Sequence, residues 1–277
     1  MVRASLAARI NYSTMLLIVL PASVGPADAL ASLAVTASSA SPTDGFGHRR
    51  GGRARIAAEW LSTAESARWP EPPAGDGRPV LLIPGFLAND GSLGRMASWL
   101  RSGGFRTYRS GIPVNLACME PLVARLETRL QDVAERTGRR VLVLGQSRGG
   151  TLGRVLVTRR PELVDELVTL GSPTGSQLAV RRAAWLSIGT IGLLGTFGVP
   201  GCFSITCRNG GCCARARADL RAPFPSTCRY IVVYSKSDEI VQWQACLDPA
   251  AELIEVDTTH LGMGFDAGVW RALARAL

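Results

Sequence analysis

Histidine and lysine are scarce in this sequence, which limits the chemistry available to it. Its 277 residues include two histidines, His48 and His260, and one lysine, Lys236. The net charge of +9 therefore comes almost wholly from arginine, which indicates a coding bias rather than a nucleic-acid-binding surface. Long apolar runs are also missing. None reaches about 18 residues without a glycine, proline or charge, which excludes a polytopic membrane protein.

The composition is that of a globular protein. Apolar residues make up 47% of the chain and charged residues 19%, which excludes an intrinsically disordered chain. At this length we expect one large domain or two small ones, with ample capacity for a buried core.

The first 29 residues have the order of a secretory signal peptide. Arg3 and Arg9 precede the apolar stretch at 15–20, and Ala27–Ala29 follows with the pattern of a cleavage site. We therefore expect residues 1–29 to be a signal peptide, and the mature protein to be secreted or held in the cell envelope. The alternatives are an N-terminal extension without a targeting role and a cytoplasmic protein.

Residues 30–53 are predicted to be a flexible linker, because most of this segment is rich in serine, glycine and arginine. His48 lies within it, where a lone histidine is most often simply solvated. In the next segment, 54–68, Ile56 and Trp60 belong to an apolar set with helical spacing. This spacing predicts a short amphipathic helix that packs onto the body of the protein.

From residue 79 onwards, short β-prone runs alternate with helical stretches. This alternation predicts an α/β fold over 54–277, with a mostly parallel central sheet of about six strands flanked by helices. Reactive groups in such folds gather at the carboxyl ends of the strands. The predicted strands are 79–83, 105–108, 140–144, 166–170, 230–234 and 253–256, and the predicted helices lie near 93–102, 119–137, 149–160 and 266–277.

The third predicted strand leads into the pattern G-x-S-x-G, centred on Ser147. The small Gly145 and Gly149 allow a tight strand-to-helix turn that holds Ser147 in a strained conformation with its hydroxyl exposed. The helix dipole and the backbone N–H of Arg148 then face any developing oxyanion. A phosphate-binding loop is the rival interpretation, but this turn lacks the Gly-Lys-Ser/Thr ending of that motif.

A serine nucleophile needs a base and an acid that orients the base, and the candidates for both are few. His260 follows the last predicted strand, whereas the other histidine precedes the fold. Asp238 lies just beyond the strand at 230–234 and is our preferred acid. Glu239 is adjacent but is expected to point elsewhere, and Asp257, three residues before His260, is the main competitor.

The first predicted strand supplies a second oxyanion donor. Gly85 makes a turn at the end of this strand, where the backbone N–H of Phe86 can face the oxyanion beside that of Arg148. Phe86 and Leu87 also offer apolar contacts to an acyl group. A tight apolar turn without a catalytic role is the alternative.

Together these motifs resemble the α/β-hydrolase superfamily, and in particular its small bacterial lipases and esterases, including the lipase-like hydrolases of actinobacteria. The resemblance covers about residues 78–277. It implies ester hydrolysis through a covalent acyl-enzyme, with Ser147 as nucleophile and no cofactor. The motifs that carry it are Pro84–Phe86, Gly145–Gly149, Thr169–Pro173, Tyr234–Asp238 and His260.

The sequence departs from the family pattern at two positions. Pro84 replaces the histidine that often precedes the oxyanion glycine, and Arg148 replaces the usual small or apolar residue after the nucleophile. Neither change removes a backbone donor, so the implied mechanism survives while the substrate preference is open.

Residues 176–229 are longer than a simple crossover and are expected to form a cap or lid. The apolar stretch at 183–199 suits a lid that opens on lipid, or equally a buried packing helix. The same insertion holds seven basic residues and one acidic residue. That charge favours peripheral contact with an anionic lipid surface over nucleic acid, with arginine coding bias as the alternative.

Most of the seven cysteines lie at the end of the insertion or beside it. The insertion contains Cys202, Cys207, Cys212 and Cys213; Cys228 and Cys246 flank the strand before Asp238, and Cys118 is alone. This spacing does not match the usual zinc pairs and no histidine is near. We therefore predict disulfides that pin the cap, and no metal. Finding none would indicate a cytoplasmic protein or a metal cluster.

The sequence thus predicts a serine hydrolase acting on a small ester or lipid, with Ser147 as nucleophile, His260 as base and Asp238 as its acid. Phe86 and Arg148 would supply the oxyanion donors, and Leu87 would contact the substrate. An acyltransferase on the same scaffold is one alternative. A non-catalytic envelope protein that binds lipid or a partner is the other.

Overall fold

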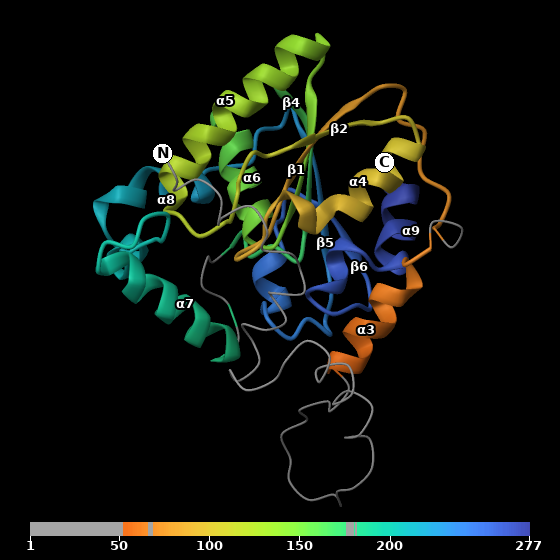
Figure 1. The fold of residues 1–277 in the computed structure, drawn as a ribbon. Coiled ribbons are helices and arrows are strands. Elements are labelled where there is room, and N and C mark those ends of the chain that lie inside the picture. Colours follow the sequence, from red (N-terminus) through yellow and green to blue (C-terminus); the bar gives the residue numbers. More distant parts are fainter. Residues whose placement is uncertain (1–51, 66–68, 176–179, 181) are drawn as a thin grey trace, which may run out of the picture.

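The computed structural model describes residues 52–65, 69–175, 180 and 182–277 (Figure 1). The predicted signal peptide at 1–29, nearly all of the predicted linker at 30–53, and His48 lie outside the described residues.

The described part of the chain is built on one sheet of six parallel strands. Their order across the sheet is β2-β1-β3-β4-β5-β6, so the chain starts near the middle, runs to one edge, returns, and then proceeds to the other edge. The predicted α/β fold class is confirmed. The strands are β1 (Pro79–Ile83), β2 (Arg106–Arg109), β3 (Val141–Gln146), β4 (Val164–Leu170), β5 (Arg229–Tyr234) and β6 (Glu252–Glu255).

Helices cover both faces of this sheet, as Figure 1 shows. On one face lie α4 and α9, and on the other α5, α6 and α8. The α-helices are α3 (Gly52–Ser62), α4 (Gly94–Ser102), α5 (Met119–Thr137), α6 (Arg148–Arg159), α7 (Arg182–Thr196), α8 (Ala214–Arg221) and α9 (Ala267–Ala276). Short 3-10 helices are η3 (Asp90–Leu93), η4 (Ile205–Arg208), η5 (Gly211–Cys213), η6 (Trp243–Cys246) and η7 (Gly262–Gly264).

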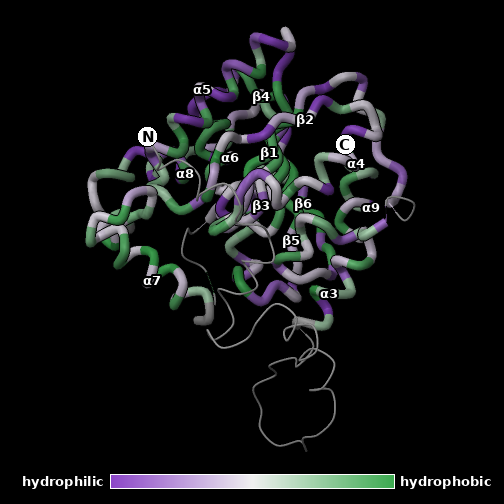
Figure 2. Tube along the Cα trace, viewed as in Figure 1, coloured by the Kyte–Doolittle hydropathy of each residue, from purple (hydrophilic) through white to green (hydrophobic). Residues whose placement is uncertain are grey.

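The central strands β1 and β3 are mostly apolar, as expected for strands whose two faces both pack against helices. Every residue of β1 and β3 is buried, and these strands form the hydrophobic centre in Figure 2. On the face covered by α4 and α9, Trp99 stacks on Trp270 with ring centroids 5.2 Å apart. This packing fixes the sheet, whose strand ends then carry the polar residues described below.

The helix predicted over 54–68 ends earlier than expected. It stops at Ser62 because Thr63 turns inward, where its hydroxyl donates a hydrogen bond to the backbone oxygen of Phe265 at 2.6 Å. Thr63 is fully buried. The helix therefore packs onto the body as predicted, but against the segment that joins β6 to α9.

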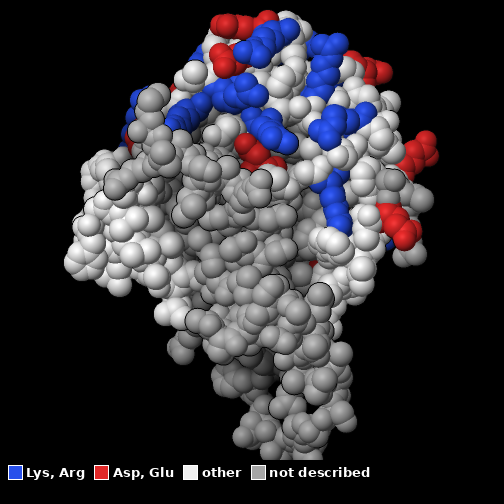
Figure 3. All heavy atoms as spheres, in the orientation of Figure 1, with Lys and Arg blue, Asp and Glu red and all other residues white. Residues whose placement is uncertain are grey.

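Between β4 and β5 the insertion forms α7, η4, η5 and α8. From Ala184 to Thr196 the sequence of α7 contains no charged residue, and its surface is white in Figure 3. Leu186 on this helix is 79% exposed, and Phe197, directly after it, is 83% exposed. A buried packing helix is therefore not what α7 forms. Among the described residues, no helix has both the length and the apolar character needed to span a membrane.

Candidate active site

Ser147 occupies the sharp turn between β3 and α6. Its backbone has φ +52° and ψ −125°, a conformation that L-residues rarely adopt. The turn requires a very close approach of α6 to β1, since a Cβ added at Gly149 would lie 2.2 Å from the backbone oxygen of Ile83. Gly149 is thus required sterically, because any side chain at this position would clash with β1. The tight turn lets Ser147 project from the end of β3.

Ser147, His260 and Asp238 form a continuous hydrogen-bonded chain. The Oγ of Ser147 lies 2.9 Å from Nε2 of His260, and Nδ1 of His260 lies 2.6 Å from Oδ2 of Asp238. His260 is 4% exposed and Asp238 is 2% exposed, so water hardly competes for these contacts. The three side chains come from the ends of β3, β6 and β5, which parallel pairing brings to one edge of the sheet.

The carboxylate of Asp238 is held by both of its oxygens. Its Oδ1 accepts hydrogen bonds from the backbone N–H groups of Ile240 at 2.8 Å and Val241 at 2.7 Å, which leaves Oδ2 directed at His260. An ionised carboxylate can only accept, so the proton of the neutral imidazole resides on Nδ1. Nε2 is then the acceptor that faces the hydroxyl of Ser147.

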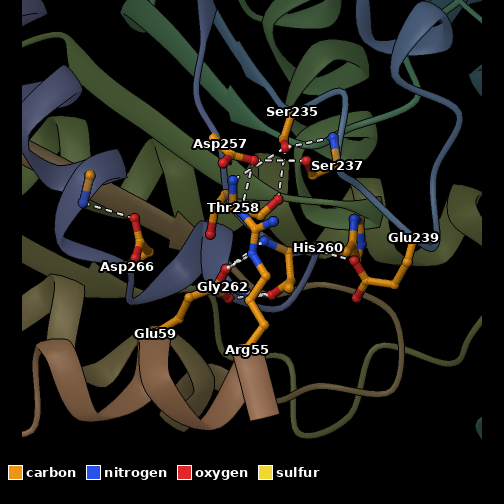
Figure 4. Close-up of polar contacts among 12 residues, drawn as sticks. Arg55, Glu59, Ser235, Ser237, Glu239, Asp257, Thr258, His260, Gly262 and Asp266 are labelled. Carbon is orange, nitrogen blue, oxygen red and sulfur yellow. Dashed lines mark hydrogen bonds and ion pairs between the residues drawn. The ribbon is translucent and has the colours of Figure 1, made fainter. Parts of the chain in front are cut away.

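The other two acidic candidates have different positions. Asp257 is 80% exposed, and its Oδ1 accepts from Arg55 at 2.8 Å and from the hydroxyl of Ser237 at 2.7 Å. Glu239 does point elsewhere than the imidazole, because its carboxylate accepts from the backbone N–H of His260 at 3.1 Å. Figure 4 shows both groups around the loop that carries His260. The acid in contact with the imidazole is therefore Asp238.

The environment of His260 favours its protonated form. Burial opposes the imidazolium, but the charge of Asp238, its hydrogen bond and the charge of Glu239 together outweigh burial. The pKa of His260 is consequently raised above its ordinary value. An imidazole with this bias accepts a proton more readily, which is what a general base beside a serine requires.

The turn after β1 lies directly beside the serine. A Cβ added at Gly85 would be 3.3 Å from the Cβ of Ser147, so residues 84–86 pass over the end of β3. Asn115 fixes this turn: its Nδ2 donates to the backbone oxygen of Pro84 at 2.8 Å, and its own backbone oxygen accepts from the N–H of Leu87 at 3.3 Å. Leu87 has φ +63°, which the turn imposes on it.

The side chain of Arg148 supports the same turn through Asn115. Its Nη1 donates to the backbone oxygen and to Oδ1 of Asn115 at 3.0 and 2.9 Å, and its Nη2 donates to the backbone oxygen of Ala117. Burial lowers the pKa of Arg148 to about 10. Its guanidinium lies 5.9 Å from the ring of Phe86 and 5.8 Å from that of Phe203. The unusual arginine of the motif therefore supports Asn115 through its side chain.

The insertion contacts the site through Phe203. The rings of Phe203 and Phe86 are 6.1 Å apart, and the backbone N–H of Phe203 donates to the oxygen of Leu116 at 2.8 Å. Phe86 and Phe203 thus form an apolar wall beside the turn that follows β1. The sequence motifs did not indicate Phe203, because its contact is with a segment far away in the chain.

Glu59 on α3 is a second residue that sequence reasoning missed. It is 7% exposed, accepts from the backbone N–H of Thr259 at 2.9 Å and also accepts from the hydroxyl of Thr259. Arg55 donates to the same carboxylate at 3.0 Å (Figure 4). Helix α3 therefore binds Thr259, the residue immediately before His260. No local sequence pattern indicates that contact.

The cysteines differ from the prediction. All seven lie among the described residues and all seven are free thiols, so the expected disulfides of the insertion are not formed in the structure. Cys118, Cys207, Cys212 and Cys213 converge without bonding one another, and Cys202, Cys228 and Cys246 are not part of that group.

Known proteins resemble this chain in structure rather than in sequence. Neither a family model nor a curated protein matches the sequence. The mature lipase BlEst2 of Bacillus licheniformis has a TM-score of 0.54 at 14% identity, over 74% of this chain and 94% of that one. The metagenomic carboxyl esterase MGS0156 has 0.56 at 14% identity, over 85% and 95%. A monoacylglycerol lipase of Paleococcus ferrophilus has 0.50 at 12%, over 74% and 97%.

These likenesses extend over nearly the whole length of each solved protein, and at such low identity they establish the architecture. With the six parallel strands and the strained serine turn between β3 and α6, they lead to one conclusion: this chain has the α/β-hydrolase fold.

Proposed function

We propose that the protein is a serine hydrolase that cleaves carboxylic esters. The observation that carries the proposal is the chain of hydrogen bonds from Ser147 through His260 to Asp238, set at the turn between β3 and α6. A base within 2.9 Å of a serine hydroxyl, itself oriented by a buried carboxylate, is the arrangement that activates serine as a nucleophile.

In the proposed reaction, Oγ of Ser147 attacks the ester carbonyl while its proton moves to Nε2 of His260. The negative charge that develops on the carbonyl oxygen is stabilised by the backbone N–H groups of Phe86 and Arg148. His260 then gives the proton to the departing alcohol, which leaves an acyl group on Ser147. A water molecule, deprotonated by His260, attacks this acyl group; the acyl–Oγ bond breaks, the acid is released, and His260 returns the proton to Oγ of Ser147. Asp238 stabilises the imidazolium in both halves without taking its proton.

The surroundings favour an apolar acyl group. Phe86 and Phe203 form the apolar wall beside the turn that follows β1, and Leu87 follows Phe86 in that turn. The similar solved structures are named as lipases and an esterase, which agrees with an ester or lipid substrate. The exposed apolar side chains of α7 suit contact with such a substrate or with a lipid surface.

A fluorophosphonate probe tests the nucleophile, because it reacts only with an activated serine. We expect labelling of the wild type and of Ser102→Ala, which lies on α4 away from the site, and none of Ser147→Ala. Absence of labelling in folded wild-type protein would refute the hydrolase and favour a non-catalytic binding protein.

Hydrolysis and acyl transfer are separated by the product. With p-nitrophenyl esters in the presence of a competing alcohol, a hydrolase releases the free acid, whereas an acyltransferase releases the ester of that alcohol. If α7 is a lid that opens on lipid, the rate on long-chain esters should rise abruptly above their solubility limit. Smooth saturation through that limit contradicts a lid.

Export is the last part of the proposal. It rests on the charge and apolar pattern of residues 1–29 alone. N-terminal sequencing of the protein recovered from the producing cells is the test. A mature chain that begins after Ala29 supports export, and a chain that retains Met1 in the cytoplasm contradicts it.

A further inference from the structure

Four cysteine thiols converge on one point, and none of them belongs to the hydrogen-bonded chain of Ser147, His260 and Asp238. They are Cys118, Cys207, Cys212 and Cys213, and their four sulfur atoms all lie within 4.8 Å of one another. The Sγ of Cys212 is 3.5 Å from that of Cys207 and 3.9 Å from that of Cys213. Three of them belong to the insertion, whereas Cys118 immediately precedes α5.

We propose that these four cysteines form a tetrathiolate site for a divalent zinc ion. A zinc–sulfur distance of about 2.3 Å in tetrahedral geometry places the sulfur atoms roughly 3.8 Å apart. A disulfide would bring two of them to about 2.05 Å. The observed separations of 3.5 and 3.9 Å lie on either side of the zinc value and are far from the disulfide value. Four sulfur ligands without oxygen or nitrogen suit zinc and do not suit magnesium, calcium or manganese, which prefer oxygen ligands.

Two of the four ligands immediately precede helices. Cys118 is the residue before the first turn of α5, and Cys213 is the residue before the first turn of α8. The starts of two helices thus fix the backbone positions of two of the four ligands. Binding of the ion displaces the four thiol protons to solvent, with no change of oxidation state.

Arginines offset the negative charge of the complex. Four thiolates and one zinc ion carry a net charge of −2, and the guanidinium of Arg148 interacts electrostatically with Cys118, Cys207 and Cys213. Arg217 fixes the loop between two ligands, since it donates to the backbone oxygen of Cys207 at 2.9 Å and to that of Gly210 at 2.7 Å. Supporting contacts of this kind hold metal ligands in place.

The burial of the ligands gives the ion a route of entry. Cys213 is buried, Cys118 and Cys207 are half-buried, and Cys212 is exposed. The cluster is therefore closed on three sides and open at Cys212. Four protein ligands complete a tetrahedral shell, so the site is structural and leaves no position for a substrate.

The position of the site explains what the ion would hold together. Cys118 follows the segment whose Asn115 binds the turn after β1 and whose Ala117 accepts from Arg148. Cys207, Cys212 and Cys213 belong to the insertion. The ion would thus tie the insertion to the segment that supports the turn beside Ser147. The spacing within the insertion did not predict this site, because the fourth ligand comes from a distant element.

Metal analysis of the full chain tests the proposal independently of activity. Untagged wild-type protein, purified from medium supplied with zinc, should contain about one zinc ion per chain by inductively coupled plasma mass spectrometry. Cys202→Ser is the matched control, since it removes a cysteine of the same insertion outside the cluster, and it should retain the ion. Cys213→Ser should lose it.

A second measurement uses only the wild type, in case the variant does not fold. Protein stripped with a chelator should bind Co²⁺ with the intense thiolate-to-cobalt charge-transfer and d–d absorption of a tetrahedral sulfur site. Chelation should lower the Tm, and zinc should restore it. Wild type without zinc or cobalt binding overturns the proposal. A disulfide between any two of the four cysteines, found by peptide mapping of protein alkylated at purification, also overturns it. Neither result depends on whether the serine is catalytic.

Discussion

Replacing Asp238 by asparagine tests the orientation of the imidazole most directly. The structure fixes which way the new amide must face. Oδ1 of Asp238 accepts two backbone N–H groups, at 2.8 and 2.7 Å, so the amide oxygen of Asn must take that place. Its NH2 group is then forced against Nδ1 of His260, where the carboxylate stood at 2.6 Å.

An NH2 group can only donate, and the imidazole must therefore accept at Nδ1 and carry its proton on Nε2. In that tautomer Nε2 cannot take the proton of Ser147. The expected loss in kcat for Asp238→Asn is about 10⁴-fold, the size of the effect of a wrong tautomer in other Ser-His-Asp enzymes. This corresponds to about 5 kcal/mol of activation free energy.

The assay is the steady-state hydrolysis of a p-nitrophenyl ester, with denaturant unfolding to show that the variant is folded. Asp257→Asn is the matched control, since this exposed carboxylate is close in sequence to His260 but binds Arg55 and Ser237 instead. It should keep kcat within a few-fold of the wild type. A folded Asp238→Asn with nearly full kcat, or an Asp257→Asn that loses as much, would refute the reasoning.

Three further substitutions probe the surroundings of the site. Glu239→Gln removes a negative charge that raises the pKa of His260; because the neutral imidazole is the active form, the acidic limb of kcat/KM should move to lower pH. Glu59→Ala leaves a buried backbone N–H without its acceptor, so the free energy of unfolding should fall by about 1–3 kcal/mol, with a lower kcat. Gly149→Ala places a Cβ 2.2 Å from the oxygen of Ile83 and should lower the free energy of unfolding by about 1–3 kcal/mol or more, measured by denaturant unfolding.

Each of these three predictions would be contradicted by a specific result. An acidic limb that stays in place or moves to higher pH in Glu239→Gln would show that this charge does not act on the imidazole. Unchanged stability of Glu59→Ala would mean that water replaces the carboxylate at Thr259. For the glycine, the control is Gly94→Ala, where an added Cβ meets no other atom within 4 Å. The two variants should differ, and equal stabilities would refute the steric argument.

Much of the fold was predictable because its determinants are local. The strand at 79–83 is a continuous apolar run, which is how a parallel strand covered on both faces looks in sequence, and the structure has β1 at the same residues. The serine turn was also predictable, since the two glycines and the serine lie within five residues. Helix α5 occupies the predicted range 119–137, because its apolar residues repeat at helical spacing.

The choice between Asp238 and Asp257 could not be made from sequence spacing alone. Both follow a strand and both precede His260, so spacing alone left the acid open. In the structure Asp238 is the one that contacts the imidazole, because the N–H groups of Ile240 and Val241 bind its Oδ1 and leave Oδ2 facing His260, while Asp257 is exposed. Such a difference depends on the path of two loops in three dimensions.

By itself, the sequence determined the order of strands and helices, the serine at the end of the third strand, and the one histidine within the fold that could serve it. Those features follow from hydrophobic periodicity and from a short motif, which act over a few residues. Only the tertiary structure decided that Glu59 holds the loop of His260, that Arg148 supports Asn115, and that Cys118 meets the cysteines of the insertion. These contacts join segments far apart in the chain, and they exist only because the parallel sheet gathers its loops at its edges.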